Sequence, residues 1–83
     1  MTIQNKLQEF INKELLSGSF EVETDESLLA DGMVDSLGML RLVTFIEETY
    51  ETRIPPEDLI IENFHTIDVI AGYLTLKGIP AGE

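Results

Sequence analysis

Residues 31–40 read Asp31-Gly32-Met33-Val34-Asp35-Ser36-Leu37-Gly38-Met39-Leu40, and the predicted fold is organised around them. Asp31-Gly32 is typical of a turn, and Asp35-Ser36 leads directly into a long amphipathic run. Aspartate and serine are favoured at helix starts because their oxygens accept hydrogen bonds from the unpaired amides of the first turn. We therefore expect Ser36 where a loop becomes a helix, with its hydroxyl near solvent. Free amides and the helix dipole would favour a phosphate-linked group there.

A helix is predicted from about Ser36 to Tyr50. Steps of about 100° per residue place one broad apolar stripe toward the core, formed by Met39, Leu42, Val43, Ile46 and Tyr50. The nearly opposite side carries Leu37, Leu40, Arg41, Thr44 and Glu48. Scattered surface leucines are common. Because this leucine pair adjoins Ser36, we interpret it as a partner-docking patch.

Three further helices complete the predicted architecture. The first begins at the cap Thr2, ends at Ser17-Gly18 and carries an amphipathic pattern of Ile3, Leu7, Phe10, Ile11 and Leu15. A short helix is expected to begin at Pro55-Pro56-Glu57-Asp58 and to end near Ile61 or Glu62. The last begins at the cap Thr66, ends at Gly78-Ile79-Pro80 and buries Ile67, Ile70, Ala71 and Leu74.

These segments predict an all-α fold, a small four-helix bundle of three longer helices and one short helix, because each helix has one apolar face to bury. The long stretch from Ser19 to Asp35 is expected to be a loop, pinned to the core by Phe20, Val22, Leu28 and Leu29. The segment between the second and last helices should cross the core with Ile54, Leu59, Ile61 and Phe64. No segment alternates with the period of a strand.

Length and charge narrow the classes of function. The chain has 83 residues, which predicts one domain over residues 1–83, with an ordered core of about 3–77 and a tail of about 78–83. Sixteen acids against five bases give a net charge of −11, which disfavours nucleic acid and anionic membranes as partners. The chain has no cysteine and no apolar run long enough to span a bilayer, and its first residues lack the basic and apolar regions expected of a secretion signal. We expect a cytoplasmic monomer.

The series of motifs resembles the acyl carrier protein family. Asp35-Ser36-Leu37 follows Asp31-Gly32 and precedes Leu42-Val43 as in the 4′-phosphopantetheine attachment site of that family. The resemblance covers Ile3 to Leu74 and includes Ile46-Glu47-Glu48, Tyr50, Arg53-Ile54-Pro55, Phe64-His65-Thr66-Ile67 and Tyr73-Leu74. A lone Asp-Ser-Leu would be a weak signal, but the ordered series is specific.

The resemblance implies a carrier with covalently attached 4′-phosphopantetheine. A phosphopantetheinyl transferase would move that group from coenzyme A onto Ser36, assisted by Asp35. The arm would then carry an acyl thioester to acyl-loading and chain-modifying synthase enzymes of fatty-acid, polyketide or related biosynthesis. Partner docking is expected at Leu37, Leu40, Arg41, Thr44, Glu47 and Glu48. An acyl cavity is expected among Val43, Ile46, Ile54, Leu59 and Ala71.

The chain departs from the fatty-acid carrier pattern at Gly38 and Arg41, where such carriers usually present acids to basic partners. Arg41 favours a partner with an acidic group beside the leucine patch. Peptidyl and aminoacyl carriers of the same fold therefore stay open. An unmodified acidic helical interaction module is the rival outside the carrier class.

Enzyme and metal-binding functions have less support. A serine nucleophile needs a base and an oxyanion site, and the only histidine, His65, lies beside a predicted helix cap, where a surface role is ordinary. A calcium loop starting at Asp25 would put Ala30 where glycine is required and Ser36 where a bidentate glutamate is required. The sequence therefore predicts no catalytic residues, no metal ligands, and a protein that is itself an enzyme's substrate.

Overall fold

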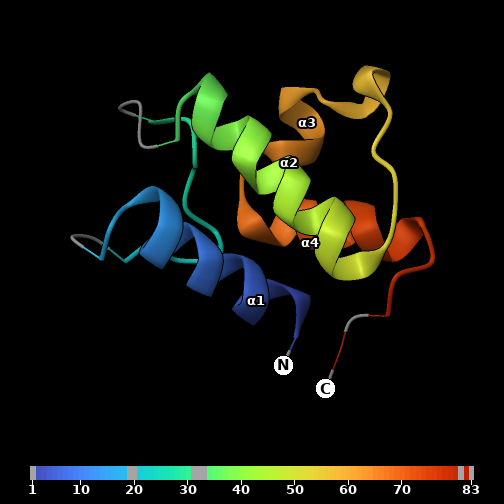
Figure 1. The fold of residues 1–83 in the computed structure, drawn as a ribbon, viewed down its shortest axis with the longest axis horizontal. Coiled ribbons are helices and arrows are strands. Elements are labelled where there is room, and N and C mark those ends of the chain that lie inside the picture. The colour runs from blue at the N-terminus through green and yellow to red at the C-terminus, as the bar shows by residue number, and fades with distance from the viewer. Residues whose placement is uncertain (1, 19–20, 31–33, 81, 83) are drawn as a thin grey trace.

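A computed structural model describes residues 2–18, 21–30, 34–80 and residue 82. The described chain forms α1 (Ile3–Phe10), a π-helical turn η1 (Ile11–Leu15), α2 (Ser36–Tyr50), a 3-10 turn η3 (Pro56–Asp58), α3 (Ile61–Phe64) and α4 (Ile67–Leu76). It contains no named strand over those residues, and an isolated bridge between Thr2 and Gly82 brings the two ends of the chain together (Figure 1). The predicted all-α fold of three longer helices and one short helix is confirmed.

The helix α1 begins where its sequence predicts. The Thr2 hydroxyl accepts a hydrogen bond from the Asn5 amide at 3.0 Å, which satisfies one free amide of the first turn. After Phe10 the helix widens into η1, where the Leu16 amide donates to the Ile11 carbonyl at 2.9 Å. The left-handed backbone of Ser17 and Gly18, at φ values of 56° and 74°, then ends the helix.

The helix α2 has the predicted bounds and the predicted core face. Leu42, Val43 and Ile46 are buried, and Met39 and Tyr50 pack partly buried beside them. The helix ends where Glu51 adopts a left-handed conformation, with φ and ψ both 50°.

The bounds predicted for the short helix, from Pro55 to near Ile61 or Glu62, are wrong. Within that range only Pro56–Asp58 form a helical turn, η3. The helix α3 is separate and spans Ile61–Phe64. Between them Leu59 (ψ 67°) and Ile60 (φ −121°, ψ 158°) leave the helical region, which suits the β-branched Ile60.

The same break corrects which side chains cross the core. Ile54 and Phe64 are buried as expected, but Leu59 and Ile61 are 38% and 65% exposed. Two apolar side chains of this segment are therefore available at the surface.

The helix α4 is capped by Thr66, whose hydroxyl accepts from the Val69 amide at 3.0 Å. Its predicted apolar stripe is buried, and the core continues past the helix to Ile79. Among the described residues the core unites all four α-helices with the loop residues Val22, Leu28 and Val34.

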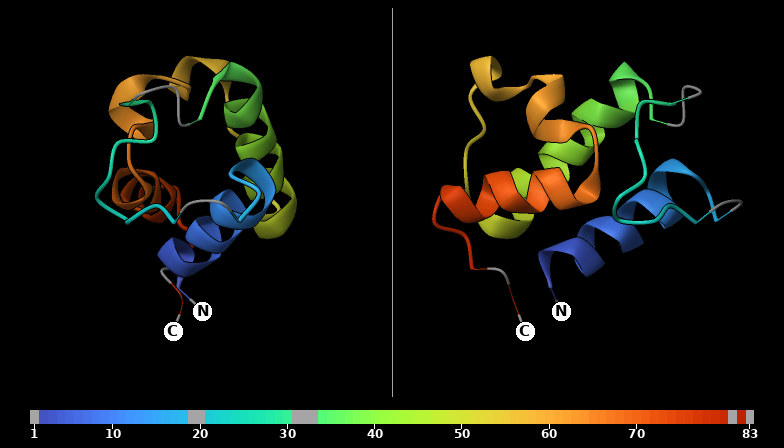
Figure 2. Two further views of the ribbon diagram at one scale, coloured as in Figure 1. Left: turned by 90° about the vertical axis from the view of Figure 1, so that its left-hand side faces the viewer. Right: turned by 180° about the vertical axis from the view of Figure 1, so that it is seen from behind.

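The loop before α2 is held by hydrogen bonds to two helices. The Gln8 side chain donates to the Val22 carbonyl at 2.7 Å, which ties the loop to α1. The Leu28 amide donates to the His65 carbonyl at 2.8 Å, and the Asp68 amide donates to the Thr24 carbonyl at 2.9 Å. These two bonds tie the loop to the start of α4. Figure 2 shows residues 21–30 passing on the side of the molecule where α3 and α4 lie. The expected contacts of Phe20 and the Asp31-Gly32 turn lie outside the described residues.

Candidate functional site

The site is built on the first turn of α2. Asp35 is the N-cap, and its Oδ1 accepts a hydrogen bond from the Gly38 amide at 2.8 Å. Ser36 is the first residue of the helix and its side chain is exposed. Because Asp35 supplies the cap, the Ser36 hydroxyl is left to face solvent at the positive end of the helix.

Glycine at position 38 permits this close-packed start. A Cβ atom there would lie 3.2 Å from Val34 Cγ1 and 3.3 Å from Asp35 Oδ1. The residue therefore leaves room for the buried Val34 side chain and for the capping carboxylate at once.

An apolar groove of about 620 Å³ opens beside Ser36. Met39 and Leu40 of α2 line it on one side, and the segment from η3 to α3 lines it on another. The full lining is Leu29, Val34, Asp35, Ser36, Met39, Leu40, Leu59, Ile60, Ile61 and Phe64. Its apolar walls suit an alkyl chain, and its polar groups suit the attachment point of one.

The groove uses different residues from the predicted cavity. Of the predicted set only Leu59 lines it. The other four, Val43, Ile46, Ile54 and Ala71, are buried in the core between the helices. The signal in the sequence was the run Leu59-Ile60-Ile61, three consecutive apolar residues that no helix periodicity explains.

The residues of α2 that the sequence predicts to dock partners differ in how freely they are presented. Leu37 and Leu40 are 68% and 57% exposed, and Thr44 and Glu48 are also exposed. Arg41 is exposed but engaged, since its guanidinium lies 3.8 Å from the Glu14 carboxylate and donates to the Glu14 carbonyl at 3.3 Å. Its charge therefore helps to join α2 to the end of η1.

Glu47 has a structural partner. Its Oε2 accepts a hydrogen bond from the Ile54 amide at 2.8 Å, and the residue is half-buried. This contact fixes the chain that leaves α2, so Glu47 is not a freely presented acid.

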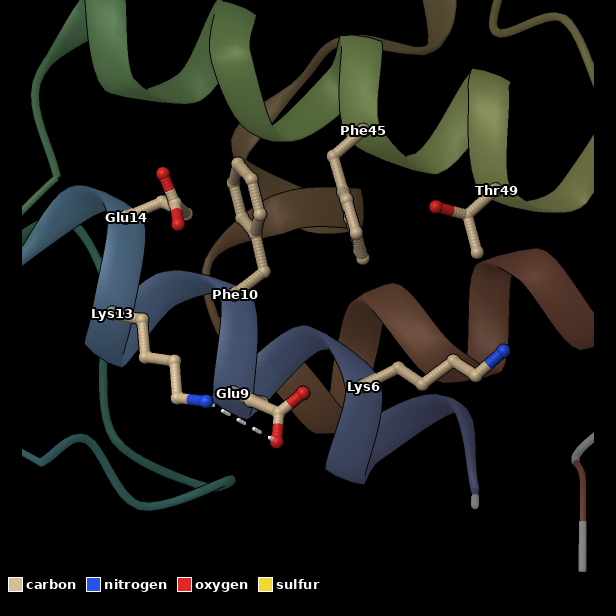
Figure 3. Close-up of a pocket in the computed structure, with 7 residues that line it drawn as sticks. All are labelled: Lys6, Glu9, Phe10, Lys13, Glu14, Phe45 and Thr49. Carbon is tan, nitrogen blue, oxygen red and sulfur yellow. Dashed lines mark ion pairs between the residues drawn. The ribbon is translucent and has the colours of Figure 1, made fainter.

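A second pocket, of about 310 Å³, lies in the seam between α1 and α2. Figure 3 shows the rings of Phe10 and Phe45 meeting between the two helices, with centroids 4.3 Å apart and planes at 16°. Lys6 and Lys13 of α1 border it, and Lys13 lies 3.9 Å from the Glu9 carboxylate. No residue of this pocket lines the groove beside Ser36, so the two are separate.

The groove segment has one strong tie to α4. The Tyr73 hydroxyl donates to Asp58 Oδ2 at 2.5 Å. Burial, followed by this hydrogen bond and the charge of Asp58, raises the pKa of Tyr73 well above its usual value. The phenol therefore stays protonated and keeps donating at neutral pH.

The described residues offer little other chemistry. They contain no group of three or more metal-ligating His, Asp or Glu side chains, and no described helix is long and apolar enough to cross a membrane. The His65 Nδ1 lies 2.9 Å from the Ile61 carbonyl, at the junction of α3 and α4. Its ring closes a turn of the backbone.

Comparison with known proteins adds a family context. The family model described as a phosphopantetheine attachment site matches residues 2–74. An acyl carrier protein of Bdellovibrio bacteriovorus is 33% identical over 78 residues, which cover 94% of this chain and 97% of that protein. An acyl carrier protein of Kineococcus radiotolerans is 33% identical over 73 residues, 88% of each chain. A D-alanyl carrier protein of Streptococcus uberis is 26% identical over 70 residues, 84% of this chain and 87% of that protein. No solved structure matches the chain significantly.

Proposed function

Because this chain belongs to the acyl carrier protein family, whose cofactor is covalently attached 4′-phosphopantetheine, we propose that Ser36 is the residue that bears it. The observation that carries the proposal is the exposed Ser36 side chain at the first position of α2, beside an apolar groove. The attached phosphodiester would lie at the positive end of the helix, where an anion is favoured. The arm supplies a thiol that holds an acyl group as a thioester.

The protein residues have distinct tasks in this proposal. Asp35 fixes the first turn of α2 and leaves a negative charge beside the hydroxyl. A phosphopantetheinyl transferase supplies the base and metal ion for transfer from coenzyme A. The Ser36 hydroxyl gives its proton to that base and its oxygen bonds to the phosphorus of the phosphopantetheinyl group, while the pyrophosphate P–O bond of coenzyme A breaks and adenosine 3′,5′-bisphosphate leaves.

Loading by a broad-specificity transferase tests the assignment. We expect the wild-type protein, incubated with coenzyme A and the transferase, to gain the mass of one phosphopantetheine. Ser36→Ala should gain none, because no acceptor oxygen is left. Ser27→Ala is the matched control, since Ser27 is a described loop serine away from the groove lining, and it should load like wild type. A wild-type protein that gains no mass would favour the unmodified interaction module instead.

We further infer that the cargo is an acyl group of the kind used in fatty-acid, polyketide or related biosynthesis. Eight of the groove's lining residues are apolar, namely Leu29, Val34, Met39, Leu40, Leu59, Ile60, Ile61 and Phe64. An aliphatic chain buried there gains favourable transfer from water, whereas the ammonium of an aminoacyl group would lose its hydration. An aminoacyl cargo stays the second candidate because a D-alanyl carrier protein is among the relatives.

Thermal unfolding separates the two cargoes. Protein loaded with a medium-length saturated acyl group should melt higher than the form with the bare arm, because a ligand that binds only the folded state stabilises it. An alanyl group on the same arm should leave the melting temperature unchanged. Equal stabilisation by both groups would contradict the assignment of an aliphatic cargo.

We propose that loading and synthase enzymes of the cytoplasm dock on the exposed Leu37 and Leu40 beside Ser36. The neighbouring Arg41 is drawn toward Glu14 by two contacts, so its charge is partly neutralised. Apolar contact should therefore contribute more to partner affinity than charge at this patch. A Leu37→Ser variant is expected to weaken transferase binding, whereas Leu76→Ser is a control at the far end of α4, where Leu76 is 90% exposed.

A further inference from the structure

The groove wall formed by residues 56–64 is poorly anchored by apolar packing. The turn η3 has no buried residue, and α3 buries Phe64 alone. Leu59, Ile60 and Ile61 are 38%, 46% and 65% exposed. Few buried contacts and short helical turns are features of segments that open locally at low free energy. The wall therefore depends on polar contacts for its position.

Asp58 is the centre of those polar contacts. Its carbonyl accepts from the Ile60 amide at 2.9 Å and from the Asn63 side chain at 3.0 Å. Its carboxylate accepts from the Tyr73 hydroxyl at 2.5 Å. This last bond ties the segment to α4, because Tyr73 belongs to that helix, and the Tyr73 ring also packs against Phe64 at 5.6 Å. The Asp58 amide and the Ile61 carbonyl bond only to the adjoining residues Pro55 and His65, each at 2.9 Å.

We infer that the Tyr73–Asp58 hydrogen bond is the positioning contact that sets the width of the groove and so limits the length of acyl chain it encloses. The inference deepens the function proposed for Ser36 and rests on it. A long chain must displace the wall formed by Leu59, Ile60 and Ile61, and the bond to α4 resists that displacement. Tyr73 and Asp58 act through the wall, since neither lines the groove.

Amide hydrogen exchange tests the anchoring without any attached arm. In Tyr73→Phe the ring can keep its packing on Phe64 while the hydroxyl is lost. The wall amides of Leu59, Ile60 and Asn63 should then exchange at least about tenfold faster, while core amides of α1 keep their rates. Unchanged wall exchange would overturn the inference, whether or not Ser36 accepts the arm.

Tyr50→Phe is the matched control. The Tyr50 hydroxyl is buried and has no hydrogen-bond partner among the described residues. Removing it therefore breaks no tie to the groove wall, and the wall amides should exchange as in the wild type. If the wall amides exchange faster in this control as well, the faster exchange of Tyr73→Phe comes from a general loss of stability, and the inference is overturned.

The length limit is tested on protein loaded with saturated acyl groups of increasing length. The gain in melting temperature over the bare arm should stop growing at a shorter chain in wild type than in Tyr73→Phe. The same limit in both proteins would overturn the specificity role. If the arm does not load on Ser36 at all, the function proposed for Ser36 fails and the length limit fails with it. The exchange result then reports on the wall alone.

Discussion

Asp35 joins a structural contact and a proposed functional charge in one side chain. Its Oδ1 caps α2 through the Gly38 amide, and its carboxylate lies next to the proposed attachment residue. The two contributions separate on substitution because asparagine keeps a capping oxygen but carries no charge.

Substitution of Asp35 should therefore give two different patterns. Asp35→Ala is expected to lower the free energy of unfolding by about 1 kcal/mol through loss of the cap. Asp35→Asn should stay within a few tenths of wild type, yet load more slowly if the transferase reads the charge. Urea unfolding and the initial rate of mass gain measure the two effects. If the asparagine variant loads at the wild-type rate, the only role of Asp35 is to cap α2.

The raised pKa of Tyr73 should be visible when the folded protein is titrated with alkali. Burial first, then the bond to Asp58, raises its pKa, and burial also raises the pKa of Tyr50. In the unfolded chain both phenols ionise near pH 10. The folded protein should therefore form little phenolate at that pH, as read by ultraviolet absorbance.

The sign of the stability effect follows from the same shift. Above about pH 10 the unfolded chain has released phenol protons that the folded chain retains, so folding stability falls as pH rises. The decline should be shallower in Tyr73→Phe, which lacks one of the two phenols. A free energy of unfolding that is flat from pH 9 to pH 11 would contradict the burial of these phenols.

The sequence predicted the residues whose environment is local. The caps Thr2, Asp35 and Thr66 depend on atoms three residues away, and they lie where the pattern indicated. The groove lining could not be predicted in the same way, because Leu29, Ile60 and Ile61 come to line one groove only after the bundle has formed. Periodicity marks which residues are apolar, but not which apolar residues border an open groove.

At the scale of elements, α1 and α2 meet through one aromatic pair. Phe10 and Phe45 stack at 4.3 Å, and Arg41 reaches Glu14 near the end of the same seam. At about 100° per residue, Phe45 falls between the core face and the exposed face of α2, so the position of α1 decides which side it contacts.

A double-mutant cycle should detect this contact. Phe10→Leu and Phe45→Leu keep apolar bulk, so the cycle isolates the ring–ring interaction. We expect a coupling energy of about 0.5–1.5 kcal/mol in urea unfolding. Strictly additive single effects would mean that the rings share a seam without stabilising it.

The two departures from the predicted elements have a common physical origin. At the π turn of Ile11–Leu15 and at the break of Leu59-Ile60, tertiary packing determines the backbone conformation. The sequence does indicate where these segments end or begin, through Ser17-Gly18 and Pro55-Pro56. It does not predict the hydrogen-bond pattern of the backbone within them.

At the scale of the whole molecule, charge is the dominant feature. The net charge is −11, and the described residues form only two ion pairs between side chains, both exposed and near 4 Å. Pairs of this kind contribute little, so repulsion among the acids is largely uncompensated.

Salt should therefore stabilise the fold. The melting temperature is expected to rise as ionic strength increases, and to rise further with divalent cations, because screening weakens the repulsion of the compact state. Differential scanning calorimetry across a salt series measures the effect. A melting temperature that does not change over the series would show that the acids are too far apart to repel strongly.

The most direct test of the account is to locate the arm on the loaded protein by fragmentation mass spectrometry. All four serines, at positions 17, 19, 27 and 36, fall in the tryptic peptide between Lys13 and Arg41, so digestion alone does not distinguish them. Fragment ions should place one phosphopantetheine on Ser36 and leave the other three serines unmodified. An arm on any other serine, or none on the peptide, would contradict the proposal that the start of α2 presents the attachment hydroxyl.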